Sequence, residues 1–165
     1  MKRIDALKNE FARETETTRR QIARLPDDQL NWRPHEKSFT AGALAAHLVD
    51  CLRWTEAIFS HAELNLDPAT YQPFHAASTT ELLRGFDDAI ARGQQALDAL
   101  TDAALEQSWQ FKINGKVRFA RERDEVFRDF ALSHLIHHRG QLSVYLRLLG
   151  VAVPGSYGPT ADEQF

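Results

Sequence analysis

Four long segments of this chain carry apolar residues at helical spacing, and breaks containing proline, glycine or polar residues separate them. They cover about residues 4–25, 40–64, 79–100 and 121–149. The third follows Ser78-Thr79-Thr80-Glu81, which predicts a capping box, and Gly150 closes the fourth. Helices of about 20 residues are about 30 Å long, a length typical of four-helix bundles. We therefore predict an all-α four-helix bundle; a solenoid is disfavoured because the segments do not resemble one another.

One further element is expected between the third and fourth helices. Residues 109–119 alternate in polarity around Asn114-Gly115, a pair that accepts the positive φ angles of a two-residue turn. This pattern predicts a short β-hairpin, which must pack on a helix because two strands alone are marginal in water. The tail that follows Gly150 shows no periodicity. At 165 residues, we expect a single domain over residues 1–165.

Composition excludes several classes of partner. Hydrophobic residues make up 43% and charged residues 26%, so a core can form without disulfides or a structural metal. The formal charge of -3 argues against nucleic acid as a partner. No apolar run is long enough to cross a membrane or to form a signal peptide, and Cys51 is the only cysteine. These features predict a cytoplasmic location without a membrane or nucleic-acid partner.

Two histidines in the fourth helix are the strongest indication of chemistry. At about 100° per residue, His134 and His138 lie about 40° apart and one turn above each other. Their direction is shared with apolar positions that should face the interior of the bundle. Two imidazoles on one inward face can bind a divalent metal such as zinc, nickel or iron.

A third ligand is expected from the second helix. His47 shares a helix face with core residues and with Cys51 and Trp54. A site of His47, His134 and His138 leaves coordination positions open for water or substrate, as in catalytic zinc sites. We therefore predict these three residues as the metal ligands; the pattern indicates no catalytic residue beyond them.

Bland interpretations stand beside this one. His47 taken by itself fits a hydrogen-bonded core residue, and His137 could replace His138, although it diverges by about 60° from His134. Cys51 fits a thiolate ligand, a nucleophile or a small buried hydrophobe. Arg139 with Gly140 is expected to mark close helix packing with an exposed charge.

Four residues on the same faces as the predicted ligands are expected to contact a bound substrate: Cys51, Trp54, Gln141 and Tyr145. The remaining histidines lie in or near loops and helix ends, where we expect them to be solvated: His35, His61 and His75.

At these residues the sequence resembles the DinB family of the DinB/YfiT-like superfamily over nearly the whole chain. The carriers are Trp32-Arg33-Pro34, Ser38-Phe39-Thr40 with Leu44-Ala45-Ala46-His47-Leu48, His134-Leu135-Ile136-His137-His138-Arg139-Gly140-Gln141-Leu142, Tyr145-Leu146-Arg147-Leu148-Leu149-Gly150 and Pro154-Gly155-Ser156-Tyr157-Gly158-Pro159-Thr160-Ala161-Asp162-Glu163.

The resemblance implies a bundle in up-down-down-up order and a metal held by three histidines, which match His47, His134 and His138. It also implies a homodimer. Related proteins include transferases and isomerases that use a low-molecular-weight thiol such as bacillithiol, mycothiol or glutathione. The family name refers to DNA damage, but no basic face in this sequence supports DNA binding.

Two functions follow as hypotheses. The first is a metal-dependent thiol transferase or hydrolase, in which the ion activates a thiol or water for attack on a small electrophilic substrate. The second is a dimeric metal-binding module of the stress response without turnover.

Overall fold

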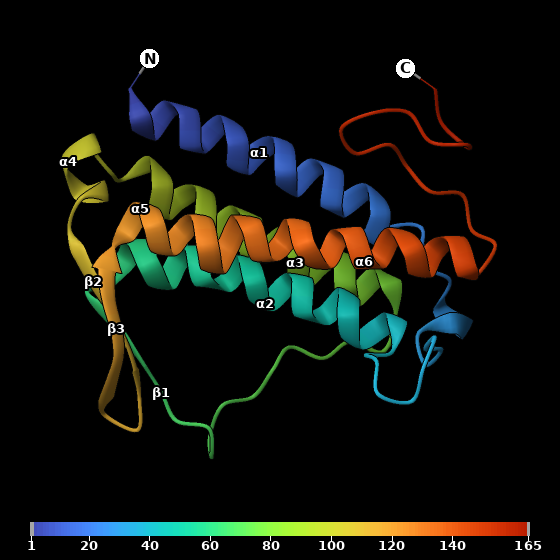
Figure 1. The fold of residues 1–165 in the computed structure, drawn as a ribbon, viewed down its shortest axis with the longest axis horizontal. Coiled ribbons are helices and arrows are strands. Elements are labelled where there is room, and N and C mark those ends of the chain that lie inside the picture. The colour runs from blue at the N-terminus through green and yellow to red at the C-terminus, as the bar shows by residue number, and fades with distance from the viewer. Residues whose placement is uncertain (1, 165) are drawn as a thin grey trace.

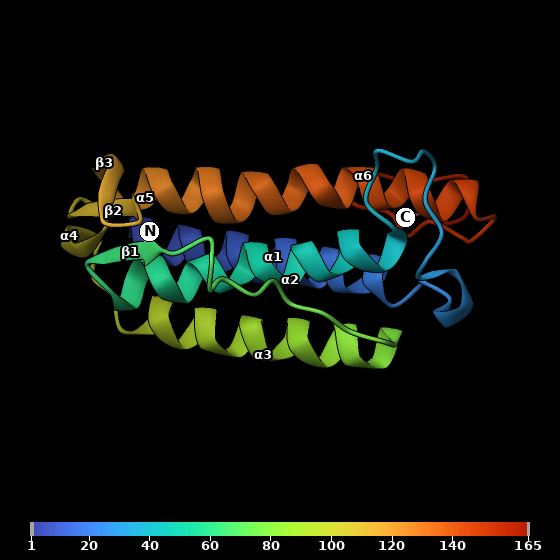
Figure 2. The same ribbon diagram turned by 90° about the horizontal axis from the view of Figure 1, so that it is seen from below.

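Four long helical segments dominate the fold. A computed structural model describes residues 2–164. The long segments are α1 (Arg3–Ile22), α2 (Ala41–Ser60), α3 (Thr79–Asp98), and a continuous run of α5 (Arg123–Val126), the π-helix η2 (Phe127–Ser133) and α6 (His134–Leu148). The two views of the ribbon show them lying side by side (Figure 1, Figure 2). The predicted helices are confirmed, with ends that differ by a few residues. Two short helices, η1 (Asp27–Gln29) and α4 (Asp102–Leu105), were not predicted.

Side chains cap two of the long helices at their first turns. Thr40 accepts a hydrogen bond from the Ala43 N–H at the start of α2. Ser78 accepts one from the Glu81 N–H at the start of α3, and the Glu81 carboxylate accepts from the Ala77 N–H. Each bond satisfies a donor that the first turn of a helix leaves free. The predicted capping box is therefore present, with its return bond shifted by one residue.

A small sheet closes one end of the helices. Its strands are β1 (Glu63–Leu66), β2 (Ser108–Ile113) and β3 (Lys116–Glu122), in the order β1-β2-β3. β2 and β3 form the predicted antiparallel hairpin, with Asn114 at φ 50° and Gly115 at φ 74°. β1 pairs with β2 in parallel.

The sheet corrects two predictions. The second helix ends at Ser60, and the residues expected to extend it to Leu64 instead lead into β1. β3 likewise takes Arg121 and Glu122 from the expected start of the last helix. The chain is therefore mostly helical with a three-stranded sheet, and the all-α expectation was incomplete. The partner of β1 lies more than 40 residues away in sequence, so no local pattern could indicate this pairing.

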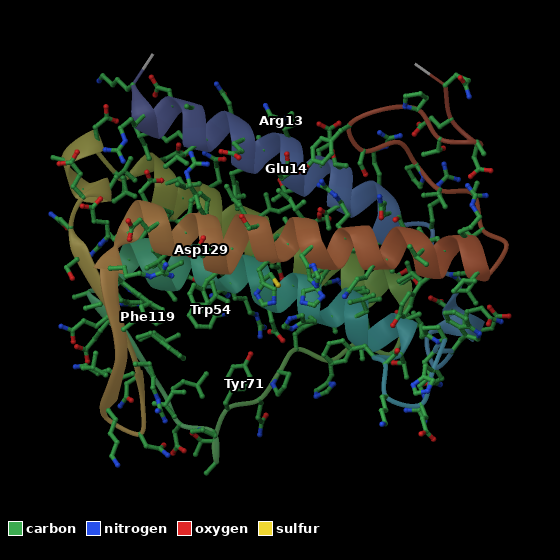
Figure 3. The ribbon with its side chains drawn as sticks, in the orientation of Figure 1. Arg13, Glu14, Trp54, Tyr71, Phe119 and Asp129 are labelled. Atoms are coloured by element: carbon green, nitrogen blue, oxygen red, sulfur yellow. The ribbon has the colours of Figure 1, made fainter. Side chains whose placement is uncertain are left out.

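Aromatic residues join the hairpin to the helices. Trp54 of α2 lies 5.3 Å from Phe111 of β2 and 5.3 Å from Phe130 of η2, between ring centroids. Phe119 of β3 lies 5.0 Å from Phe130. Trp54 and Phe119 occupy the same side of the helices (Figure 3). We call Trp54, Phe111, Phe119 and Phe130 the aromatic cluster; it provides the packing that the hairpin needs.

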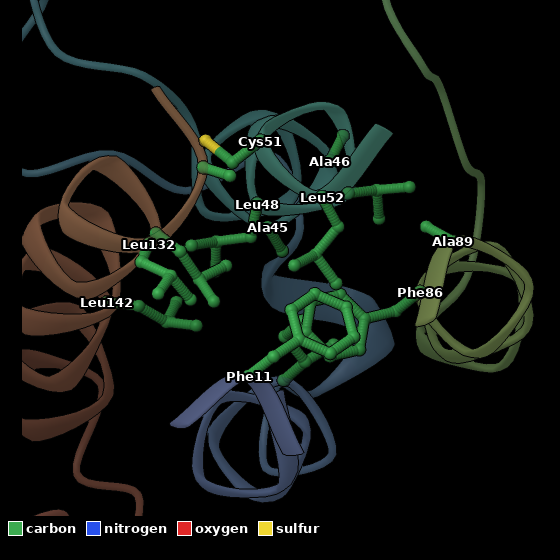
Figure 4. Packing of buried hydrophobic residues seen from close by; sticks show 14 of the residues in the cluster. Phe11, Ala45, Ala46, Leu48, Cys51, Leu52, Phe86, Ala89, Leu132 and Leu142 are labelled. Atoms are coloured by element: carbon green, nitrogen blue, oxygen red, sulfur yellow. The ribbon is translucent and has the colours of Figure 1, made fainter. Parts of the chain in front are cut away.

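The main core lies between the long helices. Phe11 of α1 and Phe86 of α3 are fully buried, and in Figure 4 both side chains point into the space below Leu52 of α2. Leu48 of α2 and Leu142 of α6 continue this layer toward the last helix. Among residues 2–164, no helix has the length and apolar character needed to span a membrane.

Candidate metal centre

His47 of α2 and His134 of α6 point their Nε2 atoms at each other. The two nitrogens are 3.3 Å apart, and the ring planes are inclined at 72°. Both side chains are half-buried. Two nitrogens held tetrahedrally at about 2.0–2.1 Å from one zinc ion stand about 3.3 Å apart. The spacing of these two donors therefore fits a shared divalent metal.

Cys51 completes the tightest group of metal-ligating atoms. Within the described residues, one ligand atom each from His47, Cys51 and His134 lies within 4.8 Å of the others. Cys51 follows His47 by one turn of α2, so both side chains leave the same helix face. Its side chain is 1% exposed. The open interpretation of Cys51 as a ligand thus has the geometry it requires.

His138 lies against this group but is not a member of it. Its ring centroid is 4.6 Å from that of His47 and 4.7 Å from that of His134. The His138 Nδ1 is 2.7 Å from the Gln141 Oε1, which can only accept a hydrogen bond. This contact assigns the proton to Nδ1. The lone pair of Nε2 is therefore free to bind a metal ion. The predicted three histidines are therefore neighbours, with Cys51 as an additional donor.

The π-helix η2 determines how α6 presents these side chains. It ends at Ser133, so His134 is the first residue of α6. Hydrogen bonds in a π-helix span five residues, and such turns occur often at functional sites. The wider turn changes the angular relation of Phe130 and His134 from that of a regular α-helix. From His134 onward the helix is regular, and His138 stands one turn above it.

Burial keeps the histidines of this centre neutral. Desolvation lowers the pKa of His47 to about 4, and the neighbouring His138 and His134 add to the effect. Desolvation also lowers the pKa of His134 and of His138. Neutral imidazole is the form that binds metal. The centre is therefore ready to bind a cation at neutral pH.

The Cys51 thiol is in the opposite situation. Burial raises its pKa to about 12, and the nearby Asp50 carboxylate adds to the rise. In the absence of a metal the thiol stays protonated at neutral pH, and it is a poor nucleophile. The nucleophile interpretation of Cys51 is therefore disfavoured.

Phe39 covers the centre, which the sequence did not indicate. Its ring is stacked on His47 at 5.7 Å and meets His138 edge-on at 6.5 Å, between centroids. The Phe39 carbonyl accepts a hydrogen bond from the Tyr145 hydroxyl at 3.2 Å. Phe39 is 51% exposed, so one face of its ring is open to solvent. The sequence pointed to Phe39 only as part of the Ser38-Phe39-Thr40 segment that carries the family resemblance.

The four predicted substrate contacts have different surroundings. Cys51 lies within the ligand group, and Gln141 is hydrogen-bonded to His138 and, at 3.1 Å, to His137. Tyr145 packs edge-on against Trp32 and holds the loop that carries Phe39. Trp54 belongs to the aromatic cluster. His137, like the three loop histidines expected to be solvated (His35, His61 and His75), is exposed.

Arg139 contradicts its predicted exposure. It is 2% exposed, and its guanidinium donates to the Glu14 carboxylate at 2.8 Å and to the Tyr157 hydroxyl at 2.6 Å. The Tyr157 hydroxyl in turn donates to Glu14 at 2.7 Å. The partners come from α1 and the C-terminal tail, so nothing local in the sequence could show them. Gly140 is not a close-packing site either, because a Cβ there would meet nothing within 4 Å.

The comparisons with known proteins agree with this architecture. The sequence model of the DinB family matches residues 1–164. The chain belongs to the DinB family. A relative from Bacillus subtilis (strain 168), named uncharacterized protein YrdA, is 25% identical over 152 residues, which are 91% of this chain and 85% of that protein.

Two solved structures of DinB-like proteins share the fold. The protein from Bacillus cereus ATCC 10987 has a TM-score of 0.68 at 22% identity, covering 90% of this chain and 94% of its own. The Bacillus subtilis protein YjoA has a TM-score of 0.70 at 18% identity, covering 96% and 98%. In this DinB-family chain, a His/Cys group in the helical interior is thus a candidate metal site.

Proposed function

We propose that this protein is a divalent-metal-dependent enzyme whose ligands are His47, His134 and His138. The observation that supports the proposal best is the 3.3 Å spacing of the His47 and His134 Nε2 atoms. The donor set suits zinc, nickel or iron, since imidazole binds all three. When bound, such an ion lowers the pKa of a coordinated thiol or water at neutral pH.

The protein's own residues prepare the reaction with a small electrophilic substrate. Gln141 orients His138 through Nδ1, and the half-buried histidines remain neutral. Phe39 restricts the access of water over His47 and His138. A low-molecular-weight thiol would give a thiol transferase, and water would give a hydrolase.

The architecture and setting belong to the same proposal. The colours of Figure 1 show α1 and α6 running in one direction, and α2 and α3 in the other. This arrangement supports a four-helix bundle in up-down-down-up order, in one domain spanning residues 1–165. A cytoplasmic homodimer remains part of the proposal, by the family resemblance and the single cysteine.

Cys51 favours a second function. If its sulfur joined the three histidines around the ion, four protein ligands would close the coordination sphere, as in structural zinc sites. The protein would then be a metal-binding stress-response module without turnover. The raised pKa of Cys51 opposes this reading in the metal-free protein, but a bound ion would remove the thiol proton.

Metal loading with zinc, nickel or ferrous iron, followed by elemental analysis, tests both functions. We expect about one ion per chain, and its loss in His134→Ala and His138→Ala variants. His75→Ala, an exposed histidine, is the matched control and should retain the ion. A stoichiometry unchanged in His134→Ala would refute the proposed ligands.

Cobalt substitution separates the two functions. Added thiol should change the visible spectrum of the cobalt protein if a coordination position is open. The closed binding module would be favoured if added thiol leaves the spectrum unchanged and if the sulfur-to-cobalt band disappears in the Cys51→Ala variant.

A further inference from the structure

A cavity beside the metal centre has no role in the proposal so far. Its volume is about 330 Å³, and it lies between α2, β1 and the loop that follows β1. Trp54 and Ala57 of α2, Leu64 and Leu66 of β1, and Tyr71 contribute its walls. Figure 3 shows Trp54 and Tyr71 on the same side of the helices. This volume is at the lower end of the range for small-molecule sites. It suits a ligand with a single ring or with two fused rings.

The loop that covers the cavity is held in place. We call residues 67–74 the strap. Its first turn is closed at Asp67, whose carbonyl accepts from the Tyr71 N–H at 2.8 Å. Its last residue, Phe74, donates its N–H to both oxygens of the buried Asp50, at 3.2 and 3.1 Å. The Phe74 ring fills the space that a Cβ on Gly85 would occupy. The cavity is therefore formed in advance of any ligand.

The charged side chains that line the cavity already make contacts within the protein. Arg53 lies 3.4 Å from the Asp50 carboxylate and over the Phe74 ring at 5.3 Å. The Asp67 carboxylate accepts from the Ala69 N–H at 2.9 Å. Arg53 is thus paired with Asp50, and the Asp67 carboxylate is hydrogen-bonded to a backbone N–H, while Trp54 and Tyr71 offer aromatic faces. The chemistry suits an uncharged, flat aromatic ring.

The cavity adjoins the metal centre through α2 and the aromatic cluster. Trp54 follows Cys51 by three residues, about 4.5 Å along the helix axis. On its other side Trp54 meets Phe130, which lines an open hollow of about 580 Å³ together with His134. Trp54 thus stands between the cavity and the hollow that contains His134. Because Tyr71 is 48% exposed, the strap side provides an entrance.

We propose that the cavity between Trp54, Leu64 and Tyr71 binds an uncharged aromatic ring, and that this ring belongs to the substrate of the metal centre. The second half of this statement rests on the proposed function. The first half concerns binding alone and applies to metal-free protein as well.

Indole is a suitable probe because it is flat, uncharged and smaller than the cavity. Titration of ¹⁵N-labelled protein, with and without zinc, should shift the Trp54 indole signal in a saturable way. The Trp32 signal should not move, since that residue packs on Tyr145 instead. Trp54→Phe assigns the signal. Benzoate and benzylamine should bind about tenfold more weakly, because moving their charge from water into a mostly apolar cavity costs free energy.

Ala57→Leu fills the cavity from the α2 side and should weaken indole binding about tenfold or more. Tyr71→Ala removes the opposite wall and should weaken it without filling the space. Ala91→Leu, at an exposed position of α3, is the matched control and should leave binding unchanged. Retained melting temperatures would exclude misfolding as the cause.

The outcomes separate the two proposals. Absence of a saturable Trp54 shift, or equal binding by benzoate, would overturn the cavity proposal even in protein that holds zinc. Indole binding by a protein that takes up no metal ion on loading with zinc, nickel or ferrous iron would overturn the proposed function and leave the ring site standing. With a reactive aromatic electrophile, Ala57→Leu should raise KM about tenfold with little change in kcat; an unchanged KM would disconnect the ring site from the reaction.

Discussion

The contacts of single side chains explain how α6 is held next to the candidate metal centre. Arg139 follows His138 directly, yet it points away from the histidines, to Glu14 of α1 and Tyr157 of the tail. The Arg139 guanidinium also lies 5.0 Å from the centre of the Tyr157 ring. One residue of the motif thus turns toward the metal centre while its neighbour anchors the helix on the opposite face.

Removal of Arg139 should cost more stability than removal of a surface ion pair. Arg139→Ala leaves the buried Glu14 carboxylate without its buried cation, and we expect the free energy of unfolding to fall by about 3–5 kcal/mol. Tyr157→Phe should cost about 1–3 kcal/mol, because it removes a single hydroxyl from the network. Urea denaturation provides the measurement.

Arg92→Ala is the control, since its ion pair with Glu56 is exposed and should contribute about 0–1 kcal/mol. Equal losses for Arg139→Ala and Arg92→Ala would mean that the buried pair has no special weight.

Gln141 offers a test of ligand orientation. Gln141→Leu removes the acceptor of the His138 Nδ1 proton, and metal affinity should fall about 10–100-fold. Gln141→Glu keeps an acceptor at that place and should restore most of the affinity. Competition against a chromogenic chelator measures both. Comparable metal affinities for Gln141→Leu and the unmodified protein would show that Gln141 does not orient His138 for metal binding.

At the level of elements, glycine has opposite roles in the helices α3 and α6. Gly85 of α3 leaves room for the Phe74 ring of the strap, because a Cβ there would lie 2.3 Å from the Phe74 Cζ atom and the ring would have to shift. Gly140 of α6 is free of such contacts. The requirement for glycine therefore comes from packing in α3, whereas in α6 glycine only weakens the helix.

Substitution of each glycine by alanine should give opposite signs. Gly85→Ala forces the Phe74 ring out and should destabilise the protein by about 1–3 kcal/mol. Gly140→Ala should stabilise it by about 0.5–1 kcal/mol through helix propensity. Thermal denaturation of the two variants checks the pair. A stable Gly85→Ala variant with unchanged indole binding would show that the strap does not depend on Phe74.

For the whole molecule, the neutral histidines link folding to pH. The pKa values of His47, His134 and His138 are lowered in the folded protein, that of His47 to about 4. The unfolded chain, with ordinary values near 6.5, therefore binds more protons in this window. Stability should rise with pH between about 4 and 6.5, and should be lost as pH falls through that range.

Melting temperatures of metal-free protein between pH 7.5 and 4.5 measure this dependence. His47→Gln removes the histidine with the most lowered pKa, so its curve should be flatter than that of the unmodified protein. Bound zinc should raise the melting temperature at pH 7.5 and lose its effect toward pH 5, as protons displace it. Parallel curves for the variant and the unmodified protein would contradict the pKa assignment.

The sequence by itself determined the parts whose causes are local. Helical periodicity, the Ser78 cap and the Asn114-Gly115 turn depend on residues within a few positions of one another. His134 and His138 share one face of α6 because they are one turn apart. His47 points inward because it lies among core residues of α2. These signals were sufficient for the helices, the hairpin and the neighbouring three histidines.

Only the tertiary structure decided the features that depend on distant partners. β1 exists because β2 pairs with it across more than 40 residues, and Arg139 is buried because Glu14 and Tyr157 meet it from other parts of the chain. Cys51 and Phe39 join the candidate metal centre through packing between α2, α6 and the loop before α2. Hydrogen bonds, ion pairs and desolvation act through space, so periodicity along the chain cannot reveal them.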